Sequence, residues 1–209
     1  MRIILTHEQA DFDALASLLG AYLLDESSLP VLPRRMNRNV RAFLTLYGVE
    51  LPFVDPRDLP NEPVEAVTLV DTQSAVSIKG MGSETRFTVI DHHPPRPGLP
   101  EEWVINILET GATTTLLIEA LREQNGDLTT IQATLLLLGI YEDTGSLTYT
   151  RTTARDLRAA AYLIEQGANL TIAANFLNHP LSQAQQKLYD QLRANIEHVH
   201  IQGHTILIA

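Results

Sequence analysis

Four short polar segments contain the residues whose types and spacing could do chemistry, and each segment follows an apolar run. In open α/β sheets, functional groups gather just beyond the carboxyl ends of strands. Helix capping would account for Asp13 alone and turn formation for Asp71 alone, but neither accounts for the whole set. The candidate residues are His7, Asp11, Asp13, Asp71, Asp91, His92, His93 and Asp143.

Carboxylate and imidazole groups in a chain without cysteine indicate a centre for divalent metal ions. Mn²⁺ is favoured where oxygen ligands predominate, and Mg²⁺, Co²⁺, Fe²⁺ and Zn²⁺ are alternatives. The ligands outnumber what one ion needs, whereas two ions roughly 3.5–4 Å apart, bridged by a shared carboxylate, would use them all. Such a pair activates a water molecule and clamps phosphoryl oxygens, so no protein nucleophile is required. The absence of a Gly-x-Ser-x-Gly elbow agrees with this, and the absence of a Gly-x-x-x-x-Gly-Lys loop argues against an NTPase.

The elements that must position these groups alternate between short apolar runs of strand character and helical segments. Strands are predicted at 2–5, 29–32, 66–70, 87–90 and 103–107, and helices at 14–24, 37–47, 113–121, 129–138, 154–165 and 182–198. This order predicts an α/β fold, with a parallel, mostly five-stranded sheet and helices on both faces. Adjacent side chains of extended backbone point to opposite sides. His92 and His93 are therefore expected to diverge, one toward the metals and the other toward the substrate.

Composition and charge indicate where the protein is located and what it binds more clearly than which reaction it catalyses. A net charge of −10 argues against broad electrostatic capture of nucleic acid. Bound cations can reverse the local sign of an acidic pocket, so the charge does not exclude a phosphorylated substrate. No apolar run approaches the roughly 20 residues that span a bilayer, and the apolar start of the chain is too short for a signal peptide. The sequence therefore predicts a cytoplasmic protein without membrane association.

The C-terminal part indicates a second domain. A long, polar helix is predicted after residue 181, and Thr205–Ala209 begins a strand where the chain ends. We expect a domain at 1–180, followed at 181–209 by a linker helix and the first strand of a truncated second domain. A C-terminal edge strand of a complete protein is the alternative. Homodimerisation is compatible with the sequence.

With these motifs in this order, the chain resembles the DHH phosphoesterase superfamily, named for the tripeptide seen here as Asp91-His92-His93. The resemblance covers roughly residues 1–170. It implies that His7 and Asp11 bind one metal, that Asp13, His92 and Asp143 bind the other, and that Asp71 bridges the two. It also implies that His93 contacts the scissile phosphate and that Asp91 orients a neighbouring histidine.

The resemblance extends to the segment Gly111–Thr115, which is similar to the family's Gly-Ala-Thr/Ser segment at the start of a helix. Thr113 and Thr114 would then face a substrate anion, although helix capping is a simpler interpretation. Arg38 is a further candidate for substrate binding. Arg34, Arg38 and Arg41 would share one helical face if the helix begins early, and a solvated face is the alternative.

One departure separates this chain from many nuclease-type members, which have Pro-Asp-Gly-Asp where this chain has Ala10-Asp11-Phe12-Asp13. The ligands are kept, but Phe12 replaces glycine beside the metals. This variant is similar to the DHH module of large bacterial proteins that continue into a DHHA1 domain, CBS domains and a poly(A) polymerase or CCA-adding-type nucleotidyltransferase. Because the DHHA1 domain supplies much of the substrate contact in the family, the isolated chain is expected to bind metal but to turn over poorly.

The predicted function is hydrolysis of phosphodiester bonds in short single-stranded nucleic acid or dinucleotides by a manganese-dependent phosphoesterase. Two alternatives remain open. One is a pyrophosphatase or exopolyphosphatase acting on a phosphorylated small molecule. The other is a non-catalytic module that binds a nucleotide or metal within a larger RNA-processing protein.

Overall fold

The computed structural model describes residues 1–124, 126–177 and 183–208. The chain forms two compact units, Met1–Leu177 and Asn178–Ala209, each with its own architecture. The predicted domain boundary after residue 180 lies outside the described residues. Within the described residues, no helix combines the length and the apolar character needed to cross a membrane.

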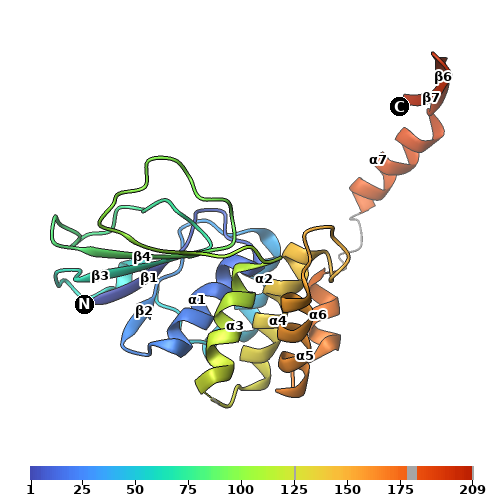
Figure 1. Cartoon of the computed structure of the whole chain (residues 1–209). Helices are drawn as coiled ribbons and strands as arrows, with labels where there is room; N and C mark the ends of the chain where they lie inside the picture. Colours follow the sequence, from blue (N-terminus) through green and yellow to red (C-terminus); the bar gives the residue numbers. More distant parts are fainter. Residues whose placement is uncertain (125, 178–182, 209) are drawn as a thin grey trace. The chain divides into compact units, whose positions relative to one another are not determined.

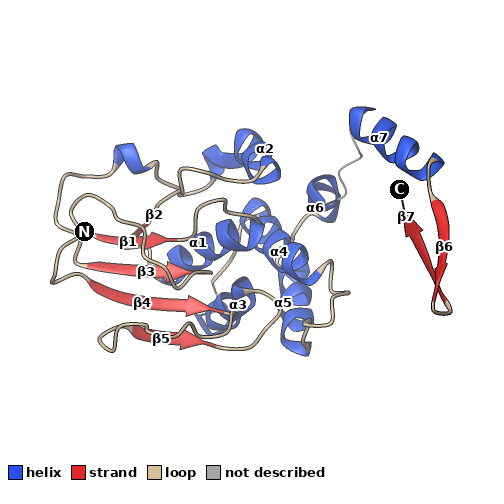
Figure 2. Ribbon diagram, turned by 90° about the horizontal axis from the view of Figure 1, so that it is seen from above, coloured by secondary structure: helices blue, strands red, loops and turns tan. Residues whose placement is uncertain are grey.

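Five strands of the first unit form one parallel sheet in the order β2-β1-β3-β4-β5 (Figure 2). They are β1 (Arg2–Leu5), β2 (Ser28–Pro30), β3 (Ala66–Val70), β4 (Arg86–Asp91) and β5 (Val104–Ile107). In the sheet, β2 lies on one side of β1 and β3 lies on the other side of β1. The direction in which successive strands are added therefore reverses between β1 and β3. Ligands bind outside the carboxyl ends of strands at such a switch point. The predicted α/β class and five-stranded parallel sheet are confirmed.

The α-helices described in the first unit contribute to one hydrophobic core on a single face of the sheet (Figure 1). They are α1 (Phe12–Leu24), α2 (Arg38–Tyr47), α3 (Thr113–Gln124), α4 (Thr130–Thr144), α5 (Ala154–Glu165) and α6 (Leu170–Leu177). Helix α4 contacts α1, α3, α5 and α6, and this central place explains why its middle is apolar on all sides. Gly139 permits the close approach of α1 to α4, since a Cβ there would lie 2.6 Å from the Cβ of Ala16.

The opposite face of the sheet buries a smaller core that includes Ile3, Leu5 and Val67. Connecting segments cover it, among them the stretch after the 3-10 helix η2 (Pro56–Asp58), and Leu59 packs against this core. No α-helix of the described residues contributes to it. The expectation of helices on both faces is therefore corrected to helices on one face. The reason is that the connections from β3 to β4 and from β4 to β5 contain no helix.

Helix termini differ from the prediction in ways that affect the candidate residues. Asp11, not Asp13, caps α1, and its Oδ1 accepts a hydrogen bond from the amide of Ala14 at 3.0 Å. Helix α4 continues past its predicted end at residue 138, so Asp143 lies in its last turn, before Gly145 in the left-handed conformation. Both helices are longer than predicted because tertiary contacts, not apolar periodicity alone, decide where they begin and end.

Two further differences concern α2 and α6. Asn37 caps α2 and the helix begins at Arg38, so the early start that would have put Arg34 on one helical face with Arg38 and Arg41 does not occur. A short 3-10 turn, η1 (Gly48–Glu50), follows α2 directly. Helix α6 was not predicted, yet its Phe176 is buried in the core against Phe43.

The second unit consists of α7 (Gln183–Ala194) followed by a two-stranded antiparallel hairpin, β6 (Glu197–Ile201) and β7 (His204–Ile208). The predicted helix from 182 to 198 therefore ends earlier, at Ala194, and its last residues belong to β6. The strand expected from residue 205 is present as β7. Both strands are largely exposed, including apolar side chains such as Ile206 and Leu207.

Candidate metal centre

The candidate ligands converge where β1, β3 and β4 end and where α4 reaches its last turn. They form three overlapping groups in which the ligand atoms lie within 4.8 Å of one another. The groups are His7–Asp11–Asp71, Asp13–His92–Asp143 and Asp71–Asp91–His92–His93. Segments separated by more than a hundred residues therefore meet in one cluster of side chains, as the switch point of the sheet allows.

His7, Asp11 and Asp71 make up the first group. The Nε2 atom of His7 lies 3.3 Å from Oδ2 of Asp71, while its Nδ1 lies 2.8 Å from the carbonyl oxygen of Glu8. A hydrogen bond from Nδ1 to a carbonyl sets the tautomer in which Nε2 carries the free lone pair. His7 therefore presents a ligand atom to the space that it shares with the two carboxylates.

Asp13, His92 and Asp143 make up the second group. The Nε2 atom of His92 lies 3.3 Å from Asp143 and 4.0 Å from Asp13, while its Nδ1 lies 3.2 Å from the carbonyl oxygen of Thr110. This Nε2 is buried and has no hydrogen-bond partner among the described residues. A buried, unpartnered nitrogen surrounded by carboxylates fits a cation ligand, because such a group otherwise loses the stabilisation of water.

Asp71 connects the two groups. Its Oδ2 faces His7, and its Oδ1 lies 3.7 Å from Nε2 of His92. The hydroxyl of Thr113 donates to the same Oδ1 at 3.0 Å, which fixes the carboxylate. Asp71 thus offers one oxygen to each group, as a carboxylate bridging two cations must.

Backbone strain concentrates at this centre. The described non-glycine residues with positive φ are Gln9, Asp71, Ser146, Leu147 and Gln202. All except Gln202 lie in or beside the segments that carry the ligands. Left-handed conformations cost on the order of 1 kcal/mol or more for most residues and persist where the surroundings determine them. The strain at Asp71, with φ of 55°, turns its carboxylate out of the strand direction.

Crowding of carboxylates alters the ionisation of the whole centre. Burial, together with the facing Asp71 and Asp143, raises the pKa of Asp13 well above its usual value. Burial likewise raises the pKa of Asp11. The hydrogen bond with Asp71 raises the pKa of His7 to about 9. These shifts arise because clustered negative charge favours bound protons, and divalent cations would satisfy the same negative charge. The donor set therefore fits two divalent cations.

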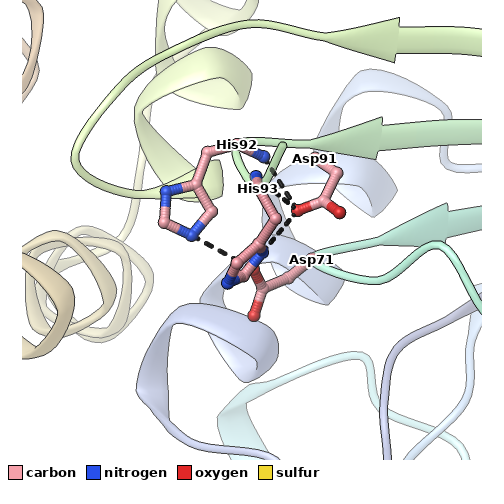
Figure 3. Close-up of side chains that lie close together, drawn as sticks. All are labelled: Asp71, Asp91, His92 and His93. Atoms are coloured by element: carbon pink, nitrogen blue, oxygen red, sulfur yellow. Dashed lines mark hydrogen bonds and ion pairs between the residues drawn. The ribbon is translucent and has the colours of Figure 1, made fainter. Parts of the chain in front are cut away.

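Asp91 and His93 lie beside His92 and Asp71 (Figure 3). Asp91 Oδ1 accepts from the amides of His92 and His93, at 2.8 and 3.1 Å, and lies 2.8 Å from Nδ1 of His93. Burial alone would raise the pKa of Asp91, but the hydrogen bonds from His93 and Gln73 outweigh it and lower this pKa. The His93 side chain is 51% exposed, so it can reach a bound molecule.

The two histidines do not diverge as the sequence predicted. Their ring centroids are only 4.2 Å apart and the rings meet edge to face. His93 Nδ1 also lies 3.6 Å from Asp71 Oδ1, so both rings border the carboxylate of Asp71. The alternation of side chains fails because β4 ends at Asp91, before the two histidines, and extended geometry stops there.

The start of α3 holds the ligands. The amides of Thr113 and Thr114 donate to the two carboxylate oxygens of Asp13, at 2.7 and 2.9 Å. Both threonines are fully buried. The helix N-terminus therefore binds an anion, but the anion is the side chain of Asp13. The structure gives these threonines a positioning role instead of the predicted contact with substrate.

The predicted contact at Arg38 also lacks support from the geometry. Arg38 is exposed in the first turn of α2, and its side chain makes no hydrogen bond or ion pair with any described residue. Its neighbour Asn37 lies closer to the centre, with Nδ2 3.5 Å from Glu142.

Sequence reasoning missed two polar residues that support the centre. Glu142 precedes the ligand Asp143, accepts the amide of Phe12, and has a pKa that burial raises to about 7. Gln73 donates to Asp91 Oδ2 at 2.8 Å and accepts the amide of Arg96 at 2.7 Å, which ties the loop after β3 to the loop after β4. Glu142 directly precedes Asp143 and Gln73 follows Asp71 by two residues, but only the fold shows what these two side chains contact.

Asp156 was also missed, and it organises the loop before α3 from a distance. Its carboxylate accepts the amide of Gly111 at 3.0 Å, the hydroxyl of Thr115 at 2.6 Å and both the amide and the hydroxyl of Thr153. The residue is fully buried. Gly111 cannot carry a side chain here, since a Cβ would lie 2.8 Å from Asp156 Oδ2. Asp156 thereby fixes the segment whose amides hold Asp13.

We expect Asp156→Asn to lower the free energy of unfolding by about 2–4 kcal/mol, because an amide nitrogen would replace an acceptor facing buried donors. Urea denaturation measures this change. Asp127→Asn, at an exposed position, is the control and should change stability by less than about 0.5 kcal/mol. Equal stability of Asp156→Asn and the control would show that this carboxylate does not organise the loop.

Comparisons with known proteins agree with this geometry. The model of the DHH family, N-terminal domain, matches residues 2–140. The chain is 35% identical over its whole length to an A-adding tRNA nucleotidyltransferase of Geobacter sulfurreducens, but it spans only 24% of that protein. It is 30% identical to the bifunctional oligoribonuclease and PAP phosphatase NrnA of Thermus thermophilus, over 80% of this chain and 50% of that protein.

A solved structure shares the fold. An exopolyphosphatase-related protein from Bacteroides fragilis superimposes with a TM-score of 0.70 at 17% identity, covering 93% of this chain and 61% of that one. At that identity the likeness concerns the fold alone. The match of the family model over two thirds of the chain adds the sequence evidence, and on these grounds the chain belongs to the DHH family.

Proposed function

We propose that this chain is the metal-dependent phosphoesterase module of a cytoplasmic protein and that it hydrolyses phosphodiester bonds of short single-stranded nucleic acid or dinucleotides. The observation that supports this proposal is the position of Asp71, whose Oδ2 lies 3.3 Å from Nε2 of His7 and whose Oδ1 lies 3.7 Å from Nε2 of His92. We assign His7 and Asp11 to one cation, Asp13, His92 and Asp143 to the other, and Mn²⁺ as the preferred ion.

Two bound cations would supply an activated water and would neutralise the phosphoryl oxygens. The chain's own residues provide the remaining functions. The hydrogen bond that His93 Nδ1 donates to Asp91 holds the ring of the half-exposed His93 in place, so that its other ring nitrogen can donate to an oxygen of the scissile phosphate. The amides at the start of α3 keep Asp13 in place, so that the ligands are positioned before substrate binds.

The relatives favour a nucleic-acid substrate. The Thermus relative is named for oligoribonuclease and PAP phosphatase activity, and the Geobacter relative for addition of A to tRNA. Because this chain spans about a quarter of the Geobacter protein, we propose that further domains accompany it in a full-length protein: a DHHA1 domain that includes the β6–β7 hairpin, CBS domains and a nucleotidyltransferase.

One observation favours a second candidate function. Relatives that match the entire chain are named A-adding tRNA nucleotidyltransferases, in which a DHH module would bind nucleotide or metal without turnover. The aromatic substitution in the first motif does not add to this case. Phe12 is fully buried and its ring packs edge-on against Phe43 and Phe176, away from the ligands.

Metal analysis followed by product analysis tests the proposal. We expect two Mn²⁺ per chain by calorimetric titration, and Mn²⁺-dependent release of nucleoside monophosphate from a dinucleotide and from a pentanucleotide. Chelation by EDTA should abolish this release. Turnover by the isolated chain is expected to be slow, so high protein concentrations are needed.

The same assay separates the alternatives. Release of orthophosphate from pyrophosphate, without cleavage of either nucleotide substrate, would assign the chain to the pyrophosphatase class. Binding of two metals without hydrolysis of any substrate would favour the non-catalytic module. Failure to bind divalent metal at all would refute the proposed centre.

A further inference from the structure

A second concave region lies beside the metal centre, on the face of the sheet that loops cover. Arg34 lines two cavities there, with volumes of about 370 and 220 Å³, and a narrow recess of about 20 Å³. We call this region the Arg34 groove. Its defining residues are Arg34, Arg57 and Lys79 with Leu32, Pro56 and Ile78.

The narrow recess lies at the end of the groove that is nearer to the first group of candidate ligands. Thr6 and Glu8 line this recess together with Arg34, and they are the sequence neighbours of His7, a proposed metal ligand. The hydroxyl of Thr6 is buried, with 4% of the residue exposed, and it has no hydrogen-bond partner among the described residues. A buried hydroxyl without a partner is costly, so this end of the groove is built to receive a polar group or a water molecule.

The charges of the groove are opposite to those of the chain as a whole. The side chains of Arg34 and Lys79 are exposed and form no ion pair with a described residue, in a protein of net charge −10. Asp55 orients Arg57 through hydrogen bonds of 2.9 and 2.7 Å. Unpaired cations beside a phosphoesterase centre complement additional phosphates of a substrate.

The apolar walls of the groove favour a single-stranded oligonucleotide over inorganic polyphosphate as the bound polyanion. Leu32, Pro33, Met36 and Pro56 line the larger cavity beside the arginines. Inorganic polyphosphate has no apolar part that such a wall could contact. A single-stranded oligonucleotide has bases and sugars that pack on apolar surfaces, in addition to its phosphates.

We propose that the Arg34 groove binds a single-stranded oligonucleotide on one side of its scissile phosphate. Arg34 and Lys79 hold backbone phosphates, and the apolar wall contacts a sugar or base. This inference rests on the proposed function, since it names the substrate class of the same centre. It makes the groove a determinant of specificity for substrates longer than one phosphodiester.

Fluorescence anisotropy with a 3′-fluorescein-labelled, 5′-phosphorylated pentathymidylate tests the groove. Binding is measured in EDTA, so that it does not depend on metal or turnover. The double variant Arg34→Ala/Lys79→Ala is expected to bind roughly tenfold more weakly than the unmodified chain. The slope of log Kd against log salt should fall by about 1.4, which is roughly 0.7 for each lost phosphate contact on a single strand.

The matched control is Arg41→Ala/Arg158→Ala, which removes the same charge from two exposed residues outside the groove. It should bind within about twofold of the unmodified chain. Equal weakening in both double variants, or no binding by the unmodified chain, would overturn the inference. Displacement of the oligonucleotide by pentapolyphosphate as readily as by unlabelled pentathymidylate would overturn the assignment to nucleic acid.

A separate assay distinguishes failure of the groove from failure of the proposed function. If the unmodified chain binds pentathymidylate through Arg34 and Lys79 but releases no nucleotide with Mn²⁺, the groove stands and the hydrolytic function fails. If Mn²⁺-dependent release occurs while both double variants bind alike, the function stands and the groove fails.

Discussion

Replacing Asp71 with alanine is expected to abolish Mn²⁺-dependent hydrolysis, a loss of at least about three orders of magnitude in rate. Asp71 is the residue that offers one carboxylate oxygen to each group of ligands, facing His7 with Oδ2 and His92 with Oδ1. Without it, neither group keeps its full ligand set. Calorimetric titration should therefore also show fewer than two Mn²⁺ ions per chain, a readout that does not require turnover.

The left-handed backbone at Asp71 requires a second variant. Alanine tolerates a φ of 55° less well than aspartate or asparagine, so Asp71→Ala would combine loss of the carboxylate with backbone strain. Asp71→Asn keeps the conformation and can still accept the hydrogen bond from Thr113, but it removes the charge. We expect Asp71→Asn to unfold at nearly the same urea concentration as the unmodified chain and still to lose activity and the second metal.

Asp127→Ala, at an exposed position, is the control and should retain full activity and both metals. Unchanged turnover in Asp71→Asn would rule out the bridging role of this carboxylate. Loss of activity with two metals still bound would assign Asp71 to substrate positioning instead. The metal count and the rate together therefore separate the two roles.

Phe12→Ala is expected to lower the free energy of unfolding by about 3–5 kcal/mol. Phe12 is completely buried, and its ring lies edge-on to those of Phe43 and Phe176, with centroids 5.8 and 6.0 Å away. The substitution removes a large apolar side chain and both ring contacts, which are worth about 0.5–1.5 kcal/mol each beyond burial. Urea denaturation measures the loss, and thermal unfolding should shift down by roughly 6–20 °C.

The exposed Leu46 on α2 provides the control, since Leu46→Ala should change stability by less than about 0.5 kcal/mol. If Phe12→Ala does not fold, Phe12→Leu retains part of the apolar volume and should still lose a measurable part of the stability. Stability equal to that of the unmodified chain in both variants would place the ring outside the core. The result matters for function, because a ring anchored between Phe43 and Phe176 packs in the core and not among the two groups of candidate ligands.

Much of the fold and the whole set of candidate ligands could be predicted from the sequence. The run Ala66–Val70 and the helix Ala154–Glu165 occur with the predicted bounds, and the other strands of the five-stranded sheet lie within two residues of theirs, whereas the first residues of β6 were predicted as the end of a helix. Short apolar runs followed by aspartate or histidine indicate both the strands and the candidate ligands from the local sequence alone. The carboxyl ends of parallel strands must lie at one edge of the sheet, so the adjacency of the candidate ligands that follow β1, β3 and β4 could be expected from a parallel sheet, whereas Asp143 is placed there by helix α4.

Tertiary structure decided what each ligand contacts, and this could not be predicted from local patterns. The amides that hold Asp13 come from residues about a hundred positions later, and the carboxylate of Asp156 reaches back 45 positions to Gly111. Whether Phe12 faces metal or core depends on α2 and α6, elements that the first motif does not encode. Hydrophobic periodicity reports which face of an element is buried, but it carries no information about which distant segment buries it.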